Sequence, residues 1–370
     1  MDYFKHYSSN TYAGSGNQLY FDMQDGEVRT GRILYKIAVF GEYEYSILFS
    51  NIMDSTYSNG TISHKNLICS SWKIHNAKIG KCKIADAAKS VCEMTFDKDI
   101  AVSNLYDLSF NVQNEKMVMP GEFFSSDPIK MAYNKDEYLC LEITFSGKMI
   151  PYHEESLLPV FVKENGEWKY SKQMPFAGMI GCNRKVKGKI AYLGDSITQG
   201  IGTELNSYKH WNAILSEKLG ADYAFWNLGI GYGRANDAAS DGAWLHKAKQ
   251  ADLVFVCFGV NDILQGFSEE QIKKDLESIV GVLKKAGKKV ILQTIPPFEF
   301  EEKDIEKWQR LNDYIKSALR DRVDMLFDNN PCLCKDGIYP QYGGHPNAEG
   351  CSVWADGLYE STKAFIESVL

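Results

Sequence analysis

The chain has 370 residues, which is long for one ordinary domain and well suited to two. Its 41 basic and 48 acidic side chains give a formal net charge of −7, and such a surface repels phosphate backbones, which argues against nucleic-acid binding. Hydrophobic residues make up 44% of the chain and charged residues 24%, so neither disorder nor a fibrous structure is expected.

The location and the metal content are constrained by what the sequence lacks. The first residues have no basic start followed by an apolar core, so we expect no signal peptide, and no stretch approaches the ~20 apolar residues of a membrane span. The nine cysteines are odd in number and show no small-domain spacing, which favours reduced thiols in a cytoplasmic protein. Only Cys332 and Cys334 lie close in sequence, so we expect neither a metal nor a cofactor.

The first half of the chain is predicted to be β structure. Residues 31–39 and 43–49 are β-branched and aromatic runs separated by a turn, and further short strands continue towards Leu108. In residues 138–145 apolar side chains alternate, with Leu139 on one face and Cys140 on the other. Many short strands with turn signals predict an antiparallel, jelly-roll-like β-sandwich over residues 1–183.

The second half alternates strands and helices. The predicted strands are 189–193, 224–228, 253–258, 289–295 and 323–327, and the predicted helices are 207–219, 269–286, 303–320 and one that starts at Asn347. For the helix after residue 268, Ser268 and Gln271 form the pattern of a capping box, and Gly287 ends it. Repeated strand–helix units predict an α/β domain with a parallel sheet over residues 184–370.

Four loops that carry reactive or hydrogen-bonding groups lie where ligands bind in such a sheet, beyond the carboxyl ends of its strands. Ser196 follows the first strand in a tight turn, and a glycine-rich loop with Gly231 and Gly233 follows the second. Asn261 follows the third strand, and His345 precedes the last helix. Each feature alone has an ordinary explanation as a helix cap, a turn or a structural histidine, but coincidence does not readily explain all four in this order.

Together these residues resemble the SGNH hydrolases, the GDSL esterase/lipase family. Gly194-Asp195-Ser196-Ile197-Thr198 matches the family's first block, Gly259-Val260-Asn261-Asp262 the third, and His345-Pro346-Asn347 the fifth. The resemblance covers about residues 188–370 and implies a flavodoxin-like hydrolase domain. It further implies Ser196 as nucleophile, His345 as general base, and an oxyanion hole formed by the Ser196 N–H, a second-block N–H and the Asn261 amide.

Two positions depart from the family pattern. An Asp commonly stands three residues before the family's His, and here that position is Tyr342. Either Asp336 or Asp328 supplies the third triad member, or a backbone carbonyl orients His345 in a dyad, or the chain is an inactive relative. In the second block, the spacing from Asn227 that carries the family's oxyanion glycine falls on Tyr232, so Gly231 is the first candidate donor and Gly233 the second.

The β-rich first half beside such a hydrolase is similar in organisation to carbohydrate esterase family 2, which includes Ser–His dyads. We therefore expect a serine esterase that removes small acyl groups, above all acetyl, from carbohydrates, with acetylated xylan among the substrates that the resemblance implies. Tyr208, Tyr232 and Tyr342 are the candidate substrate contacts, whereas Trp211 fits a buried helix stripe.

Two rival interpretations stay open from the sequence. An acyltransferase would use the same Ser–His pair with a hydroxyl in place of water, and a non-catalytic relative would only bind carbohydrate through the β domain. In each case the partner is a small-molecule or oligosaccharide ester, without nucleic acid or membrane, and a homo-oligomer is left open.

Overall fold

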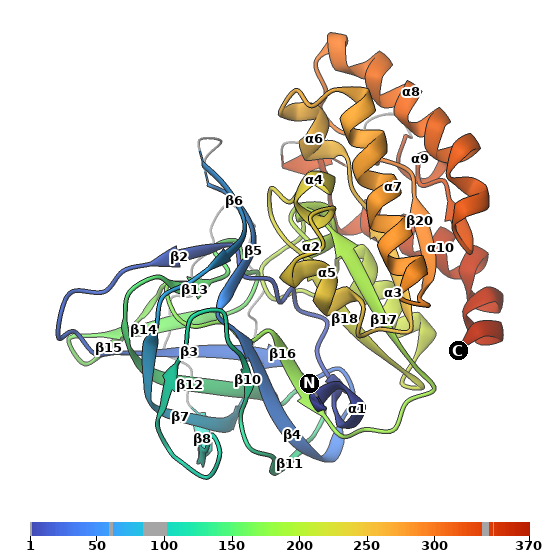
Figure 1. Cartoon of the computed structure of the whole chain (residues 1–370). Helices are drawn as coiled ribbons and strands as arrows, with labels where there is room; N and C mark the ends of the chain where they lie inside the picture. The colour runs from blue at the N-terminus through green and yellow to red at the C-terminus, as the bar shows by residue number, and fades with distance from the viewer. Residues whose placement is uncertain (1, 59–61, 84–101, 335–339, 343) are drawn as a thin grey trace. The chain divides into compact units, whose positions relative to one another are not determined.

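The computed structural model describes residues 2–58, 62–83, 102–334, 340–342 and 344–370. The chain divides into two compact units (Figure 1), each made of several segments. The first comprises Met1–Asp54, Asn66–Lys185 and Glu204–Ser207, and the second comprises Ser55–Lys65, Val186–Thr203 and Tyr208–Leu370. The main crossing thus lies two residues after the predicted boundary at 183/184, and sequence analysis did not anticipate that Ser55–Lys65 belongs to the second unit.

The first unit is mostly β structure, as predicted. In its two large sheets, the neighbouring strands pair antiparallel. One sheet contains β1 (Ser8–Ser9), β16 (Met179–Cys182), β4 (Gly41–Ser50), β10 (Phe123–Ser125) and β11 (Ile129–Tyr133). The other contains β15 (Glu167–Tyr170), β14 (Val160–Glu164), β3 (Arg29–Lys36), β12 (Tyr138–Gly147), β7 (Trp72–Cys82), β8 (Val102–Leu108) and β9 (Lys116–Val118). Smaller elements are α1 (Tyr3–His6) and the pair of β2 (Leu19–Phe21) with β13 (Ile150–Tyr152). The pair of β5 (Ile52–Ser58) with β6 (Ile62–Ile68) is divided between the units, because its Ser55–Lys65 part belongs to the second unit.

Strand β12 shows why these residues form a sandwich. Its alternate side chains Leu139, Leu141, Ile143 and Phe145 are fully buried, which confirms the predicted alternation. Between the two large sheets, the Trp72 ring on β7 meets the Phe124 ring on β10 edge to face, with centroids 6.4 Å apart. Such aromatic pairs add to the free energy of burial, so the abundant aromatic residues of this half form much of its core.

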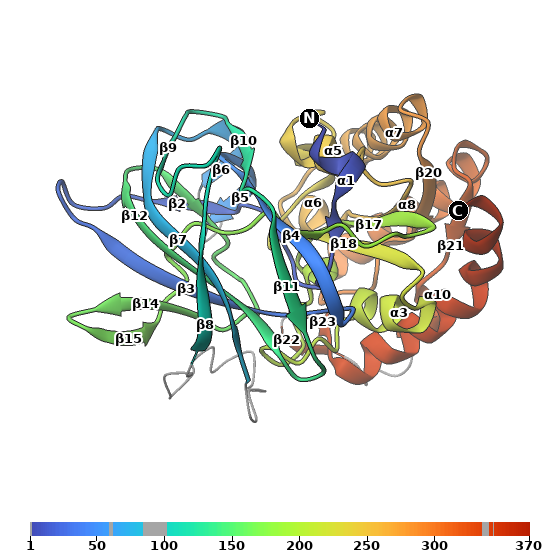
Figure 2. The same cartoon turned by 90° about the horizontal axis from the view of Figure 1, so that it is seen from below.

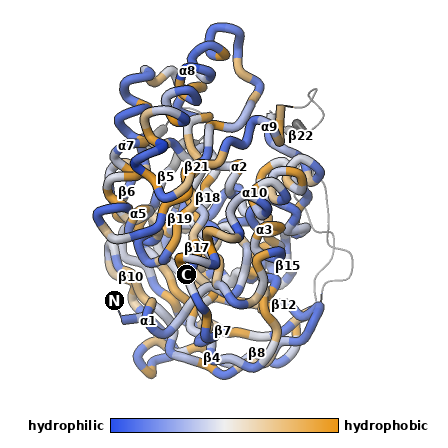
Figure 3. The backbone as a smooth tube through the Cα atoms, turned by 90° about the vertical axis from the view of Figure 1, so that its right-hand side faces the viewer, coloured by the Kyte–Doolittle hydropathy of each residue, from blue (hydrophilic) through white to orange (hydrophobic). Residues whose placement is uncertain are grey.

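The second unit contains a five-stranded parallel sheet, which confirms the predicted α/β fold. The strand order is β18 (Tyr223–Gly229), β17 (Gly188–Gly194), β19 (Leu253–Cys257), β20 (Lys289–Gln293), β21 (Met325–Phe327). This is the flavodoxin-like order 2-1-3-4-5, whose direction reverses between β17 and β19. Parallel strands are covered on both faces and are therefore apolar along their whole length, and in Figure 3 the strands of this sheet are largely orange, whereas much of α8 (Glu302–Ala318) is blue.

Helices cover both faces of this sheet, with α3 (Trp211–Leu219) and α10 (Ala348–Val369) on one and α5 (Ala243–Ala248) and α7 (Glu269–Lys285) on the other (Figure 2). Trp211 stacks on Trp354 of α10 at 4.9 Å, which agrees with its interpretation as a core residue. The shorter elements are α2 (Ser196–Gln199), α4 (Ala235–Ala238), α6 (Val260–Leu264), α9 (Asn330–Leu333), the 3-10 turn η1 (Arg320–Arg322), β22 (Pro340–Tyr342) and β23 (His345–Pro346). Among the described helices, none is both long and apolar enough to cross a membrane.

Three helix ends differ from the predictions for local reasons. Helix α3 begins at Trp211 rather than at residue 207, because Tyr208 adopts a left-handed backbone with φ of +55° that a helix does not accommodate. The Ser268 hydroxyl caps α7 by accepting from the Gln271 N–H, but the Gln271 side chain bonds Asp275, so only half of the capping box forms. Helix α8 ends at Ala318, and the turn η1 replaces its predicted last residues.

Candidate active site

The candidate residues gather at the carboxyl ends of β17 and β19, where the strand order reverses. Ser196 begins α2 two residues after β17, and Asn261 lies in α6 shortly after β19. The turn before Ser196 needs Gly194, because a Cβ there would lie 2.6 Å from the Cys257 carbonyl oxygen. Tight packing of the strand end against its neighbour therefore fixes where the serine is presented.

The Ser196 hydroxyl and the His345 imidazole are hydrogen-bonded. Ser196 Oγ lies 2.8 Å from His345 Nε2, and both residues are only 9% exposed. The His345 ring packs edge to face against Phe298 with centroids 5.1 Å apart. Gly202 lies so close that a Cβ would come within 2.8 Å of the His345 Cβ. Phe298 thus packs against the ring and Gly202 against the base of the same side chain, and the ring lies in a position to exchange a proton with Ser196.

The glycine-rich second-block loop is tied to the first and third blocks by side-chain amides. Asn227 Oδ1 accepts from the Gly229 N–H at 2.9 Å, and Asn227 Nδ2 donates to the Gln199 carbonyl at 3.3 Å. Asn261 Nδ2 donates to the Gly233 carbonyl at 3.0 Å, and Asn261 is 7% exposed. An amide nitrogen carries two hydrogens, so this bond leaves the second one for a ligand.

The backbone of this loop distinguishes the candidate oxyanion donors. The Gly233 N–H donates to the Ile230 carbonyl at 3.0 Å, so it is engaged within the turn. Gly233 also packs so tightly that a Cβ would lie 2.6 Å from the Trp244 ring. Tyr232 has φ of +59°, the left-handed conformation that glycine adopts most easily. With the hydrogen bond from the Gly233 N–H to the Ile230 carbonyl, a left-handed Tyr232 in third position is the pattern of a type II turn over residues 230–233.

Two buried carboxyl groups hold the loops behind these residues. Asp195 caps α2 by accepting from the Ile197 N–H at 3.0 Å, and Asp262 accepts from the Ala235 N–H at 2.9 Å. Burial raises the pKa of each carboxyl to about 7. From the sequence, both residues are recognised only as parts of motifs. In the structure, each carboxyl accepts a hydrogen bond from a backbone N–H group.

Of the two carboxylates expected as a third triad member, the structure describes only Asp328. Asp328 accepts from the Thr294 hydroxyl at 3.0 Å and from the Asn330 N–H at 3.2 Å, and it lies 3.9 Å from the Lys316 ammonium. Asp336 lies outside the described residues. The backbone of Tyr342 pairs with that of His345 in the small β22–β23 sheet. The identity of the group that orients His345 stays a prediction.

The aromatic candidates separate by exposure. Tyr232 is 38% exposed, whereas Tyr208 is 7% exposed and its ring lies 6.2 Å from that of His210. Burial lowers the pKa of His210 to about 4, and this imidazole hydrogen-bonds Asn212, so His210 has a structural role beside Tyr208. Phe298 was missed by sequence analysis, although it follows β20 and the same rule about strand ends points to it.

Within the described ranges, no three His, Cys, Asp or Glu side chains are grouped so that they could hold a metal ion. The groups that the candidate site brings together are a hydroxyl, an imidazole, side-chain amides and backbone N–H groups. Such a set can activate a nucleophile and hold a developing negative charge on oxygen.

Comparisons with known proteins find similarity in the C-terminal half of the chain. Residues 192–353 match the family described as the GDSL-like lipase/acylhydrolase family. The curated protein Esterase TesA of Pseudomonas aeruginosa is 29% identical over 164 residues, which cover 42% of this chain and 80% of that protein.

Similar solved structures include the psychrotrophic esterase EstA from a Pseudoalteromonas species, with 20% identity, coverage of 48% of this chain and 98% of that one, and a TM-score of 0.41. Est24 from Sinorhizobium meliloti, described as a carbohydrate acetylesterase, has 21% identity, coverage of 48% and 100%, and a TM-score of 0.41. The segment that carries Ser196, Asn261 and His345 is thus similar to the GDSL-like lipase/acylhydrolase family.

Proposed function

We propose that this protein is a serine esterase that hydrolyses small O-acyl esters, above all acetyl esters of carbohydrates. The observation that carries the proposal is the 2.8 Å hydrogen bond between Ser196 Oγ and His345 Nε2, at the same sheet edge as the Asn261 amide. A serine hydroxyl is a poor nucleophile at its ordinary pKa and needs a base within hydrogen-bond reach.

In the proposed reaction, Ser196 Oγ attacks the ester carbonyl carbon while His345 Nε2 takes the hydroxyl proton. The carbonyl oxygen becomes an oxyanion that the Ser196 N–H, the Asn261 amide and the N–H groups of Gly231 and Tyr232 stabilise. His345 then protonates the departing alcohol, which leaves an acyl group on Ser196. Water, deprotonated by His345, releases the acid in the reverse sequence.

The N–H group that the second block contributes to the oxyanion hole is assigned differently here than from the sequence alone. Gly233 is a weak candidate because its N–H already donates to Ile230. Gly231 keeps its place, and the left-handed Tyr232 joins it because the family spacing from Asn227 falls on this residue. A backbone N–H serves regardless of side chain, so a tyrosine here is compatible with activity.

We expect small acyl groups because the chain resembles acetyl esterases. The Phe298 ring, which packs edge to face against His345, supplies an apolar surface beside the two reacting side chains. The half-exposed Tyr232 ring offers an apolar face of the kind on which sugar rings stack. The acetyl and carbohydrate specificities and a cytoplasmic location remain predictions.

The test compares purified wild-type protein with Ser196→Ala on p-nitrophenyl acetate, butyrate and octanoate and on acetylated sugars. We expect acetate release by the wild type alone and falling kcat/KM with chain length. A serine-directed phosphonate should label the wild type and spare Ser196→Ala. Equal labelling of both proteins, or no release from any ester, would contradict the proposal.

The same assay separates the acyltransferase alternative, which uses the same first half-reaction. With an added sugar or alcohol acceptor, an acyltransferase forms a new ester at the expense of free acid, whereas an esterase continues to release acid. Product analysis of the acceptor reaction therefore decides between water and a second hydroxyl as the incoming group.

A further inference from the structure

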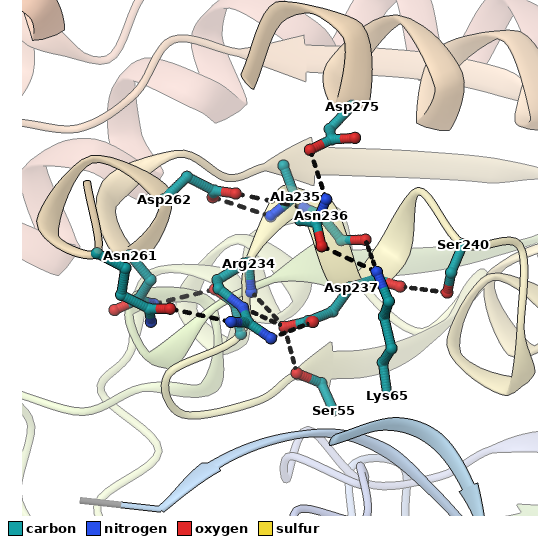
Figure 4. Close-up of polar contacts among 12 residues, drawn as sticks. Ser55, Lys65, Arg234, Ala235, Asn236, Asp237, Ser240, Asn261, Asp262 and Asp275 are labelled. Atoms are coloured by element: carbon teal, nitrogen blue, oxygen red, sulfur yellow. Dashed lines mark hydrogen bonds and ion pairs between the residues drawn. The ribbon is translucent and has the colours of Figure 1, made fainter. Parts of the chain in front are cut away.

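A polar network joins the segment after the second-block loop to a part of the chain that lies far away in sequence (Figure 4). Ser55 Oγ donates to Asp237 Oδ2 at 2.7 Å, and Lys65 Nζ donates to Asn236 Oδ1 at 2.9 Å. Ser55 and Lys65 lie on β5 and β6, in the one segment of the N-terminal half that belongs to the second compact unit. This segment is therefore part of the unit that holds the candidate active site.

The contact of Ser55 is made to a buried charge. The Asp237 side chain is fully buried and forms an ion pair with Arg234, whose side chain is 6% exposed. Arg234 Nε donates to Asp237 Oδ2 at 2.8 Å, and Arg234 Nη1 donates to Gln265 Oε1 at 3.0 Å. A buried ion pair is stable only when its atoms are well supplied with hydrogen bonds, so the Ser55 hydroxyl contributes where water cannot substitute.

The network leads directly to the proposed oxyanion donors. Arg234 follows Gly233, whose carbonyl accepts from Asn261 Nδ2 at 3.0 Å. The next residue, Ala235, donates its N–H to Asp262, the neighbour of Asn261 in α6. The ion pair at Arg234 and these two hydrogen bonds therefore fix the end of the second-block loop against the start of α6.

We propose that Ser55 is a positioning residue for the oxyanion hole, although it belongs in sequence to the N-terminal half. It orients the Asp237 carboxylate, which orients Arg234 and so holds Gly233 against the Asn261 amide. This inference rests on the proposed esterase function for its effect on turnover, but its effect on the loop itself is independent of activity. Ser55 acts through other residues and does not touch substrate.

The experiment uses two isosteric variants of the full chain, Ser55→Thr and Ser55→Val, which add the same bulk and differ only in the hydroxyl. We expect Ser55→Val to lower kcat on p-nitrophenyl acetate by at least about tenfold relative to Ser55→Thr, with KM changed by less than about threefold. Affinity for a boronic acid that becomes tetrahedral on Ser196 should fall in parallel with kcat. Lys65→Met, which removes only an exposed contact, should stay within about twofold of the wild type.

Hydrogen–deuterium exchange supplies the readout that does not need catalysis. Peptides spanning residues 229–240 should exchange faster in Ser55→Val than in Ser55→Thr, while β19 and α7 peptides stay unchanged. Equal kcat and equal exchange in the two variants would overturn the inference. An equal loss in both would also overturn it, because bulk rather than the hydroxyl would then matter. If the wild type has no esterase activity, the proposed function fails, and the exchange comparison alone decides the role of Ser55.

Discussion

The carboxyl group of Asp195 makes protein stability depend on pH in the opposite direction to most carboxylates. Burial raises its pKa from an ordinary 3.8 to about 7. Between these values the folded protein holds a proton that the unfolded chain has lost, so the free energy of unfolding falls as pH rises through this window. A gap of about three pH units at about 1.4 kcal/mol each corresponds to ~4 kcal/mol above pH 7.

The substitution Asp195→Asn tests this reasoning, because the amide keeps an oxygen that can accept from the Ile197 N–H but cannot ionise. We expect the variant and the wild type to have similar stability near pH 4, and the variant to be more stable by ~4 kcal/mol at pH 8. Asp262, whose pKa is also raised to about 7 and whose charge helps to raise the pKa of Asp195, adds a slope of the same sign in both proteins.

The assay is denaturant dependence of hydrogen exchange in β17 and β19 peptides at several pH values, which follows unfolding of the second unit. Glu301→Gln serves as a control in the same unit, because this exposed carboxyl has a pKa lowered by Lys303 and should change stability little, in the opposite direction. An Asp195→Asn variant with the pH slope of the wild type, or with lower stability at pH 8, would refute the argument.

Three further predictions test the site. Asn261→Ala should lower kcat by ~10²–10³ with a small change in melting temperature, and kcat within about threefold of wild type on p-nitrophenyl acetate would remove Asn261 from the oxyanion hole. Gly229→Ala should destabilise by about 3 kcal/mol in denaturant unfolding, because its Cβ would lie 2.5 Å from the Thr198 carbonyl carbon, whereas Gly281→Ala, in open space on α7, should stabilise slightly. Asp328→Asn should leave kcat within about tenfold, since its carboxylate is engaged by Thr294, while a loss of ~10⁴ in Asp336→Asn would identify the triad acid, and near-normal rates in both would support a dyad.

The parts of the site that sequence reasoning located are those governed by local rules. Ser196 and Asn261 follow buried strands, and the carboxyl ends of parallel strands meet at one edge, so the strand pattern alone brings these residues together. The cap at Ser268 was predictable for the same reason, since it depends on residues three positions apart. His345 needed the motif as well, because no strand of the central sheet directly precedes it.

The parts that sequence reasoning missed depend on contacts between distant segments. Ser55 lies 182 positions from Asp237, and nothing in its local pattern distinguishes it from any serine on a strand. The start of α3 was misplaced because the left-handed Tyr208 is not encoded by its residue type. The role of Gly202 beside His345 likewise appears only when the loop and the ring are brought together.

The left-handed conformation of Tyr232 explains why the second-block loop needs support from so many directions. A non-glycine residue in the left-handed conformation is less stable than in the right-handed one by about 1–2 kcal/mol. The stabilising contacts come from outside the loop, through Asn227 to α2, Asn261 to Gly233, and the buried Asp237 to Ser55. In the proposed mechanism, this strained backbone is held by the surrounding hydrogen bonds, so its N–H groups are already aimed when substrate arrives. The segment Ser55–Lys65 thus belongs with the unit that holds the candidate active site rather than with the β-sandwich.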